Sequence, residues 1–199
     1  MKTEKLRFLL TLVLIGMTTQ VVRAQQARVF LAPPSYTVSN VGLTFNVNVT
    51  IENVDDLYAW EIKLYYPNDI LNATAVAEGP FLKTGGMPTF LHLLNFTDNY
   101  SATHGLLHVF CSRVGNVSGI SGNGTLAAIT LKSIATDGPK ALHLDDVKLS
   151  NPNPGQIAYT TADGEVAVVP EFATALILPM LMILTLSAII FRKKTRTKL

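Results

Sequence analysis

The amino-acid sequence predicts an all-β domain, and three observations support that prediction. Apolar and polar residues alternate with a period of two over several stretches, as in strands that bury one face. Clusters of Gly, Pro, Asn and Asp separate these stretches, as turns between strands do. An apolar period of 3.6 residues is hardly seen between residues 25 and 169. Many short strands with regular turns favour a sandwich or a barrel.

The first 24 residues are predicted to be a signal peptide. Basic residues precede a short apolar run at residues 8–17, and residues 22–24 offer small or aliphatic side chains at the −3 and −1 positions of a cleavage site. The run is too short to span a membrane, and the pattern is typical of a cleaved export signal. Cleavage there would leave residues 25–169 as a single exported domain of ordinary size.

The clearest strand is predicted in LTFNVNVTIEN, residues 43–53. Its apolar residues occupy every second position and therefore fall on one face, while the polar residues fall on the other. The apolar set is Leu43, Phe45, Val47, Val49 and Ile51.

A second clear strand, YAWEIKLYY at residues 58–66, separates candidate core residues from candidate surface residues. We expect the set that contains the single Trp to lie in the core, namely Trp60, Ile62, Leu64 and Tyr66. The alternating set is expected on the surface, namely Ala59, Glu61, Lys63 and Tyr65. Further strands are predicted at residues 28–32, 35–38, 70–77, 88–94, 106–113, 125–134, 141–149, 156–161 and 165–169.

Residues 173–191 are predicted to form one transmembrane helix. They contain no charged residue, and at about 1.5 Å of rise per residue they reach roughly 28 Å, the depth of the hydrocarbon core of a bilayer. Five basic residues follow between residues 192 and 198. Clustered Lys and Arg beside a spanning helix stay in the cytoplasm, so we expect the β domain to face outward at the cell surface.

Charge and cysteine content narrow the possible partners. Residues 25–169 hold seven basic and twelve acidic side chains, a net charge of −5. An acidic domain argues against nucleic acid and anionic lipid, because both are dense in negative charge. Cys111 is the single cysteine, so no intrachain disulfide can form and packing must hold the domain together.

Six of the twelve Asn residues begin an Asn-x-Ser/Thr sequon in which x is not Pro, which is more than chance pairing would give. These glycosylation candidates are Asn48, Asn72, Asn95, Asn99, Asn116 and Asn123. We expect a glycosylated surface protein. The alternative, that these are ordinary polar residues of turns and strand surfaces, stays open.

No catalytic or transition-metal centre can be assembled from the sequence. Cys111 and His108 are three residues apart on one predicted strand, so they point to opposite faces, and Cys111 is interpreted as a buried small residue. If a hairpin closes around residue 100, His92 and His108 face each other across it and supply two metal ligands without a third. A pair of strand-surface residues is the interpretation that the sequence favours. The chain is therefore expected not to be an enzyme.

Two oxygen-rich clusters are candidates for a structural calcium ion, although neither has the spacing of an EF-hand loop. They are Asn53 with Asp55 and Asp56, and Asp145 with Asp146. Ordinary turn carboxylates are the alternative that the sequence favours, so no cofactor is expected.

Several segments, taken in order, resemble a cohesin module over residues 28–169. The most specific are LYAWEIKLYYPNDIL, where cohesins carry a strand ending in Tyr-Asp-Pro and then an aliphatic pair, and SGNGTLAAITLK, where a Gly-rich turn leads into a strand. The resemblance implies a jelly-roll β-sandwich of about nine strands, in the superfamily that also contains cellulose-binding modules. It also implies a binding role, with a calcium-loaded dockerin as partner.

The same resemblance points to a binding face. The outward Asn and Asp that contact the dockerin in cohesins fall on Ala59 and Glu61, and Tyr-Asp-Pro becomes Tyr66-Pro67-Asn68. Glu61 keeps a carboxylate that can accept hydrogen bonds from a partner's Ser, Thr or Lys, whereas Ala59 offers no polar group. The candidate face consists of Ala59, Glu61, Lys63 and Tyr65.

Pro170, Glu171 and Phe172, followed by the apolar span and the basic tail, resemble the PEF-type C-terminal sorting signal of archaeal surface proteins. Such a signal is read by a processing enzyme of the archaeosortase kind, which would remove the helix and leave a lipid anchor. The resemblance implies that residues 170–199 form a sorting signal.

The sequence therefore predicts a non-catalytic, cell-surface binding module of cohesin type that attaches a dockerin-type protein. Two other functions stay open. A polysaccharide-binding module would stack sugar rings on exposed Tyr58, Tyr65 and Tyr100. A structural glycoprotein of the cell envelope would need neither kind of ligand.

Overall fold

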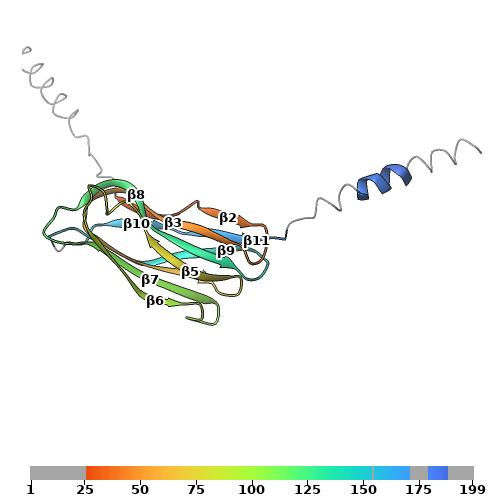
Figure 1. Ribbon diagram of the computed structural model, residues 1–199, viewed down its shortest axis with the longest axis horizontal. Helices are drawn as coiled ribbons and strands as arrows, with labels where there is room; N and C mark the ends of the chain where they lie inside the picture. Colours follow the sequence, from red (N-terminus) through yellow and green to blue (C-terminus); the bar gives the residue numbers. More distant parts are fainter. Residues whose placement is uncertain (1–25, 154, 171–178, 188–199) are drawn as a thin grey trace, which may run out of the picture.

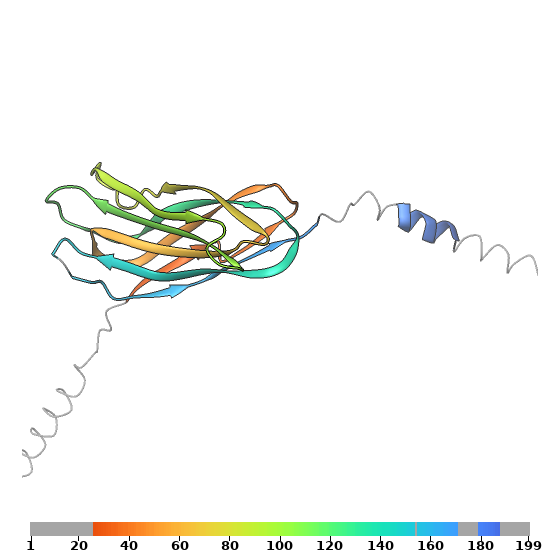
Figure 2. The same cartoon turned by 90° about the horizontal axis from the view of Figure 1, so that it is seen from below.

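The structure is a computed structural model that describes residues 26–153, 155–170 and 179–187. Within these ranges eleven strands form two sheets, which lie face to face as the layers of a sandwich (Figures 1 and 2). The strands are β1 (Ala27–Ala32), β2 (Ser35–Val38), β3 (Thr44–Leu57), β4 (Ala59–Pro67), β5 (Leu71–Glu78), β6 (Thr89–Thr97), β7 (His104–Arg113), β8 (Ile120–Ser133), β9 (Asp137–Ser150), β10 (Tyr159–Ala162) and β11 (Gly164–Val168). The predicted all-β class is confirmed.

The strand order is β10-β1-β3-β8-β5 in the five-stranded sheet and β2-β11-β9-β4-β7-β6 in the six-stranded sheet. The chain crosses from one sheet to the other near both ends of the domain, between β1 and β2 and between β10 and β11. β1 and β10 pair in parallel in one layer, and their continuations β2 and β11 pair in parallel in the other. Counting β1 with β2 and β10 with β11 reduces the eleven strands to nine, the number that the resemblance implies.

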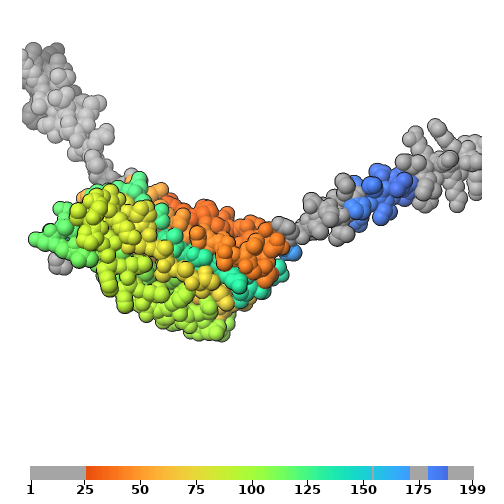
Figure 3. Space-filling view, viewed as in Figure 1, coloured from red at the N-terminus to blue at the C-terminus, as the bar shows by residue number. Residues whose placement is uncertain are grey.

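The five-stranded sheet presents a broad outer face on which β3 (orange), β8 (teal) and β5 (yellow) lie side by side (Figure 3). β3 and β8 have 14 residues each and form an antiparallel pair. Their outward residues are mostly short and uncharged, and Thr130 Oγ1 donates to Asn46 Oδ1 at 2.8 Å across the pair. This face is therefore mostly polar and uncharged.

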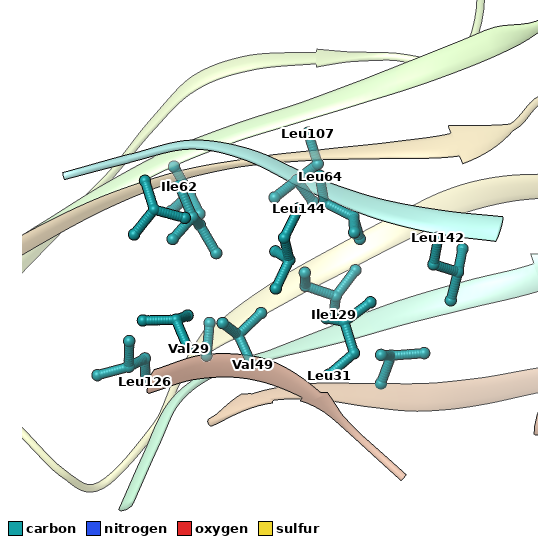
Figure 4. Packing of buried hydrophobic residues seen from close by; sticks show 14 of the residues in the cluster. Val29, Leu31, Val49, Ile62, Leu64, Leu107, Leu126, Ile129, Leu142 and Leu144 are labelled. Atoms are coloured by element: carbon teal, nitrogen blue, oxygen red, sulfur yellow. The ribbon is translucent and has the colours of Figure 1, made fainter. Parts of the chain in front are cut away.

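The core lies between the two sheets, where aliphatic side chains of both layers meet (Figure 4). Ile129 of β8 and Ile62 of β4 are fully shielded from solvent, and each such side chain stabilises the fold by about 1.5–3 kcal/mol. Trp60 is 1% exposed, which confirms its predicted place in the core. Leu43 was expected to face inward, but it precedes β3 and is 45% exposed.

Tyr66 ties the β6–β7 turn to both sheets. Its ring is fully buried against Gly105 of β7, where a Cβ would lie 2.3 Å from the ring. The Tyr66 hydroxyl donates to Asp98 Oδ1 at 2.5 Å, and the same oxygen accepts the Ala73 amide of β5 at 3.0 Å. Burial, and then the Asp98 carboxylate, raise the pKa of Tyr66, so this hydroxyl keeps its proton.

The terminal predictions fall largely outside the described residues. That applies to the signal peptide at residues 1–24, to Glu171 and Phe172, and to most of the predicted transmembrane helix, of which residues 179–187 are described and helical. No helix within the described ranges is long and apolar enough to cross a membrane. Pro170 follows β11 and is exposed. Export, anchoring and sorting stay predictions.

Candidate functional site

β4 occupies the middle of the candidate face, between β7 and β9. Both pairings are antiparallel and continue along β4, so its backbone groups are used on both edges and its side chains are what a partner can reach. Alternation along β4 points one set of side chains away from the core. The structure therefore places the candidate residues Ala59, Glu61, Lys63 and Tyr65 on one face.

The register of β6, β7, β4 and β9 arranges the outward residues of this face in rows, with neighbours in a row about 4.8 Å apart. One row has small side chains at its centre. It consists of Phe90, Ser112, Ala59 and Ser150. The next row has longer side chains and consists of His92, Phe110, Glu61 and Lys148. The step between the two rows leaves a depression on the face.

This depression, which we call the Ala59 furrow, has a volume of about 220 Å³. Its lining residues are Ala59, Trp60, Glu61, Phe110, Lys148 and Ser150. Ala59 is 8% exposed, because longer side chains stand around it. The sequence did not reveal the furrow, since it depends on small residues of three strands meeting in one row.

Glu61 is the centre of an ionic network that joins β7, β4 and β9. Its Oε1 lies 2.8 Å from His108 Nε2 and 2.9 Å from Lys148 Nζ. Burial is the largest single influence and opposes ionisation, but the hydrogen bonds from Lys148 and His108 together lower the pKa of Glu61. Glu61 Oε2 accepts no hydrogen bond from the part of the chain that the structure describes, so it can receive a donor from a partner.

A bulge in β9 extends the ionic network to Lys63. Between the pairs Glu61–Lys148 and Lys63–Asp145, β9 holds one residue more than β4, and Asp146 there has a φ of 46°. Asp146 Oδ2 consequently lies 2.6 Å from Lys63 Nζ and 3.9 Å from Lys148 Nζ. Lysines thus neutralise the Asp146 carboxylate, one of the candidate calcium ligands.

The two acidic candidates on β3 hold that strand to the start of β8. Asp55 Oδ1 accepts the Ser121 hydroxyl at 2.6 Å, and Asp56 Oδ1 accepts the Gly119 amide at 2.9 Å. Asn53 and Asp56 both have a φ of 54°, a conformation that Asn and Asp tolerate. Among the described residues no three His, Cys, Asp or Glu side chains are placed to hold a metal ion.

Two of the three candidate sugar-stacking tyrosines come together. The Tyr65 and Tyr100 rings have centroids 5.8 Å apart, and the His143 ring lies 6.4 Å from Tyr65. Tyr58 lies at the opposite end of β4, roughly 23 Å along the strand, where its hydroxyl donates to the Gly115 carbonyl at 2.8 Å. A continuous strip of all three rings is therefore not formed.

The sequon residues divide between the two faces. Asn48 on β3 and Asn72 on β5 belong to the five-stranded sheet. Asn95 on β6 is exposed and pairs with His108, so it shares a row with Lys63 on the candidate face. The remaining sequon residues are exposed outside these rows, and they are Asn99, Asn116 and Asn123.

His92 and His108 do not pair, so that expectation is wrong. The pairs next to the β6–β7 turn, such as Thr97 with Leu106, are centred past residue 100, and Leu94 is an extra residue in β6. His92 therefore pairs with Phe110 and Asn95 with His108. The predicted burial of Cys111 is confirmed at 0% exposure. Burial is the main cause that raises the pKa of its thiol to about 12, so it is a poor nucleophile at neutral pH.

A larger groove, of about 460 Å³, adjoins the Ala59 furrow on the other side of β9. Lys148 and Ser150 line both hollows, and Gln156 and Tyr159 also line the groove. Nothing in the sequence pattern indicated it, because the segment after β9 folds back beside that strand, with the Ile157 amide donating to the Leu149 carbonyl at 2.9 Å. The candidate face thus continues past β9.

Comparison with known proteins gives a consistent result. The sequence model of the Cohesin domain matches residues 31–168, while no curated protein matches the chain. A non-cellulosomal cohesin from the hyperthermophilic archaeon Archaeoglobus fulgidus is similar in structure, with a TM-score of 0.59 and 19% identity over 74% of this chain and 94% of that chain.

Two bacterial structures are similar to the same extent. A Clostridium thermocellum cohesin, solved in a type I complex with a dockerin, has a TM-score of 0.58 and 14% identity over 73% of this chain and 94% of that one. The solution structure of a Clostridium acetobutylicum protein, CaCohA2, has a TM-score of 0.57 and 20% identity, with 74% and 94% covered. At these identities the likeness shows the fold.

Proposed function

The chain belongs to the cohesin domain family, whose members are non-catalytic protein-binding modules, and we propose that it captures a dockerin-type protein. The proposal is supported by the Clostridium thermocellum cohesin, which was solved with a dockerin bound. The proposed contact surface is the outer face of β9, β4, β7 and β6, centred on Glu61.

The observation that carries this proposal is the ionic network around Glu61. The carboxylate is held in place by His108 and Lys148 through one oxygen, which leaves Oε2 to accept a Ser, Thr or Lys donor from the partner. A carboxylate held in place in this way loses little side-chain entropy on binding, so more of the hydrogen-bond energy appears as affinity.

In this proposal the module is displayed outside the cell. The expected signal peptide would export the domain, and the expected C-terminal anchor or its processed form would retain it at the surface. Calcium-loaded partners are compatible with that location, because extracellular calcium modules bind the ion at about 10⁻⁴–10⁻³ M.

Binding of purified dockerin domains to the immobilised full chain, with calcium or with a chelator, tests the proposed function. We expect saturable binding that disappears when calcium is removed. Lys148→Glu should weaken it at least tenfold, because the new carboxylate repels Glu61 and disturbs the ionic network. The matched variant Lys132→Glu changes an exposed lysine on the five-stranded sheet and should have no effect. Failure of every dockerin domain to bind would falsify the proposed function.

Polysaccharide binding is a second candidate function, favoured by the contact between Tyr65 and Tyr100. Two neighbouring rings can stack on successive sugars. Affinity electrophoresis of the full chain in gels that contain soluble polysaccharides tests it. Retardation that Tyr100→Ala abolishes would support sugar binding, whereas unchanged mobility in every gel would exclude this candidate.

A further inference from the structure

The Ala59 furrow has the features of an anchor site for a single side chain of a protein partner. Its floor is Ala59, and the row that contains it has small side chains on three neighbouring strands, Ser112 on β7, Ala59 on β4 and Ser150 on β9. Two strand spacings separate the ends of this stretch, roughly 10 Å. That length and the volume of about 220 Å³ suit one side chain and its immediate neighbours.

The furrow changes in polarity along its length. Phe110 lines the furrow on the β7 side, and Phe90, which is 54% exposed, follows Ser112 farther along the row on β6. At the β9 end the wall is Lys148, whose side chain is 54% exposed. Its Nζ lies 2.9 Å from Glu61 Oε1, and the ammonium group has further donors for an acidic acceptor of the partner. A partner that fits both ends has an apolar surface toward β6 and an acidic residue toward β9.

The type of element that can enter the furrow follows from the strand pairing. β4 and β7 are interior strands with partners on both edges, so an incoming strand finds no free backbone groups there. An element that contacts this face must do so through its side chains. A helix that lies across the strands meets this requirement, because it satisfies its own backbone hydrogen bonds.

We propose that the Ala59 furrow receives one aliphatic side chain from a helix of the protein partner, with an acidic residue of the same helix beside Lys148. This inference rests on the proposed function and deepens it, because it states the chemistry of the partner. An amide at position 59 would orient a partner hydroxyl, whereas the Ala59 methyl offers no hydrogen-bonding group, so an apolar side chain packs against it without leaving a polar atom unpaired.

A selection from a library tests this inference without a dockerin domain. The library displays rigid three-helix bundles in which the exposed positions of one helix are randomised, and it is sorted on the immobilised full chain. Recovered binders are measured against the native chain, Ala59→Leu, which fills the furrow, and Ala128→Leu. The last is the matched control on the outer face of β8, where Ala128 pairs with Asn48 and Ala77.

We expect most recovered binders to lose at least tenfold in affinity on Ala59→Leu and none on Ala128→Leu. These binders should share a Val, Ile or Leu, and replacement of that residue by Thr should weaken them at least tenfold. Lys148→Glu should remove the preference for an acidic neighbour. Equal thermal midpoints of the native chain and the three variants establish that folding is intact.

The inference is overturned if binders share a polar residue at the contact, if Ala59→Leu leaves their affinity unchanged, or if the selection recovers no binder. Failure of the dockerin domains alone would leave this result standing and would refute only the proposed partner class. Conversely, dockerin binding that tolerates Ala59→Leu would uphold the proposed function and refute the furrow as its anchor.

Discussion

Both outer faces of the sandwich arise from the same alternation of inward and outward residues, but the chemistry of their outward side chains differs. The face of the five-stranded sheet carries mostly short uncharged residues, such as Asn46, Asn48 and Thr130. The face of the six-stranded sheet carries the ionic network, the Ala59 furrow and paired aromatic rings. A period of two specifies which residues face solvent, but the chemistry of those residues separates a plain surface from a candidate binding surface.

One arginine from each sheet allows the two sheets to be compared by experiment. Arg113, at the end of β7, is 7% exposed and donates to the carbonyls of Leu82 at 3.1 Å, Thr84 at 2.8 Å and Ser118 at 2.6 Å. These acceptors lie in the two connections that cross between the sheets, β5 to β6 and β7 to β8. Arg28, on β1, is half exposed and lies 4.0 Å from Glu52.

Replacing these arginines should give the largest difference between the two sheets. Arg113→Ala leaves three carbonyls without their donor in a shielded site, and we expect it to lower the free energy of unfolding by about 3 kcal/mol. Arg28→Ala should change it by less than about 0.5 kcal/mol, as exposed ion pairs do. Chemical denaturation of both variants measures the difference, and equal losses would show that the buried guanidinium does not hold the crossovers.

The contrast between the sheets also explains what the sequence could and could not predict. Alternation alone placed Trp60 in the core and Glu61 on the surface, because side-chain direction depends only on position along a strand. Alternation does not predict which residues of two distant strands pair, because each bulge shifts the register by one residue. The bulges at Leu94 and Asp146 decide that His92 pairs with Phe110 and that Asp146 reaches Lys63.

The Ala59 furrow and the Arg113 contacts depend on how distant strands and loops come together. No local sequence pattern could therefore predict them. Ser112, Ala59 and Ser150 are far apart in the chain, and each alone is an ordinary small residue. The resemblance to cohesins supplied Ala59 and Glu61 as positions of interest. It did not supply their neighbours, which come from other strands.

Acid should weaken the six-stranded face more than the other, by an amount smaller than the Arg113 effect. The pKa of Glu61 is lowered in the folded protein, because its hydrogen bonds to Lys148 and His108 outweigh the effect of burial. Its stabilisation is therefore present above the ordinary value of 4.5 and is lost as pH falls through the folded-state value.

Chemical denaturation at pH 5.5 and pH 3.5 tests this dependence. The native chain should lose about 0.5 kcal/mol more than Glu61→Gln between these two pH values, because the amide cannot titrate. Glu52→Gln, which changes a carboxylate that is 41% exposed on the five-stranded sheet, provides the matched comparison. If Glu61→Gln and the native chain lose the same stability, the network contributes nothing to folding.

The smallest expected effect is that of a glycan on binding. It compares the two faces by their effect on partner affinity and not by stability. Asn95 shares a row with His108 and Lys63, so a glycan there would stand about two strand spacings, roughly 10 Å, from β4. Asn48 lies on the opposite sheet. For chain produced in a glycosylating host, with occupancy determined by intact mass, Asn95→Gln should raise dockerin affinity several-fold and Asn48→Gln should not change it. Equal affinity of the glycosylated chain and Asn95→Gln would mean that the partner docks toward β9 and its adjoining groove, away from β6.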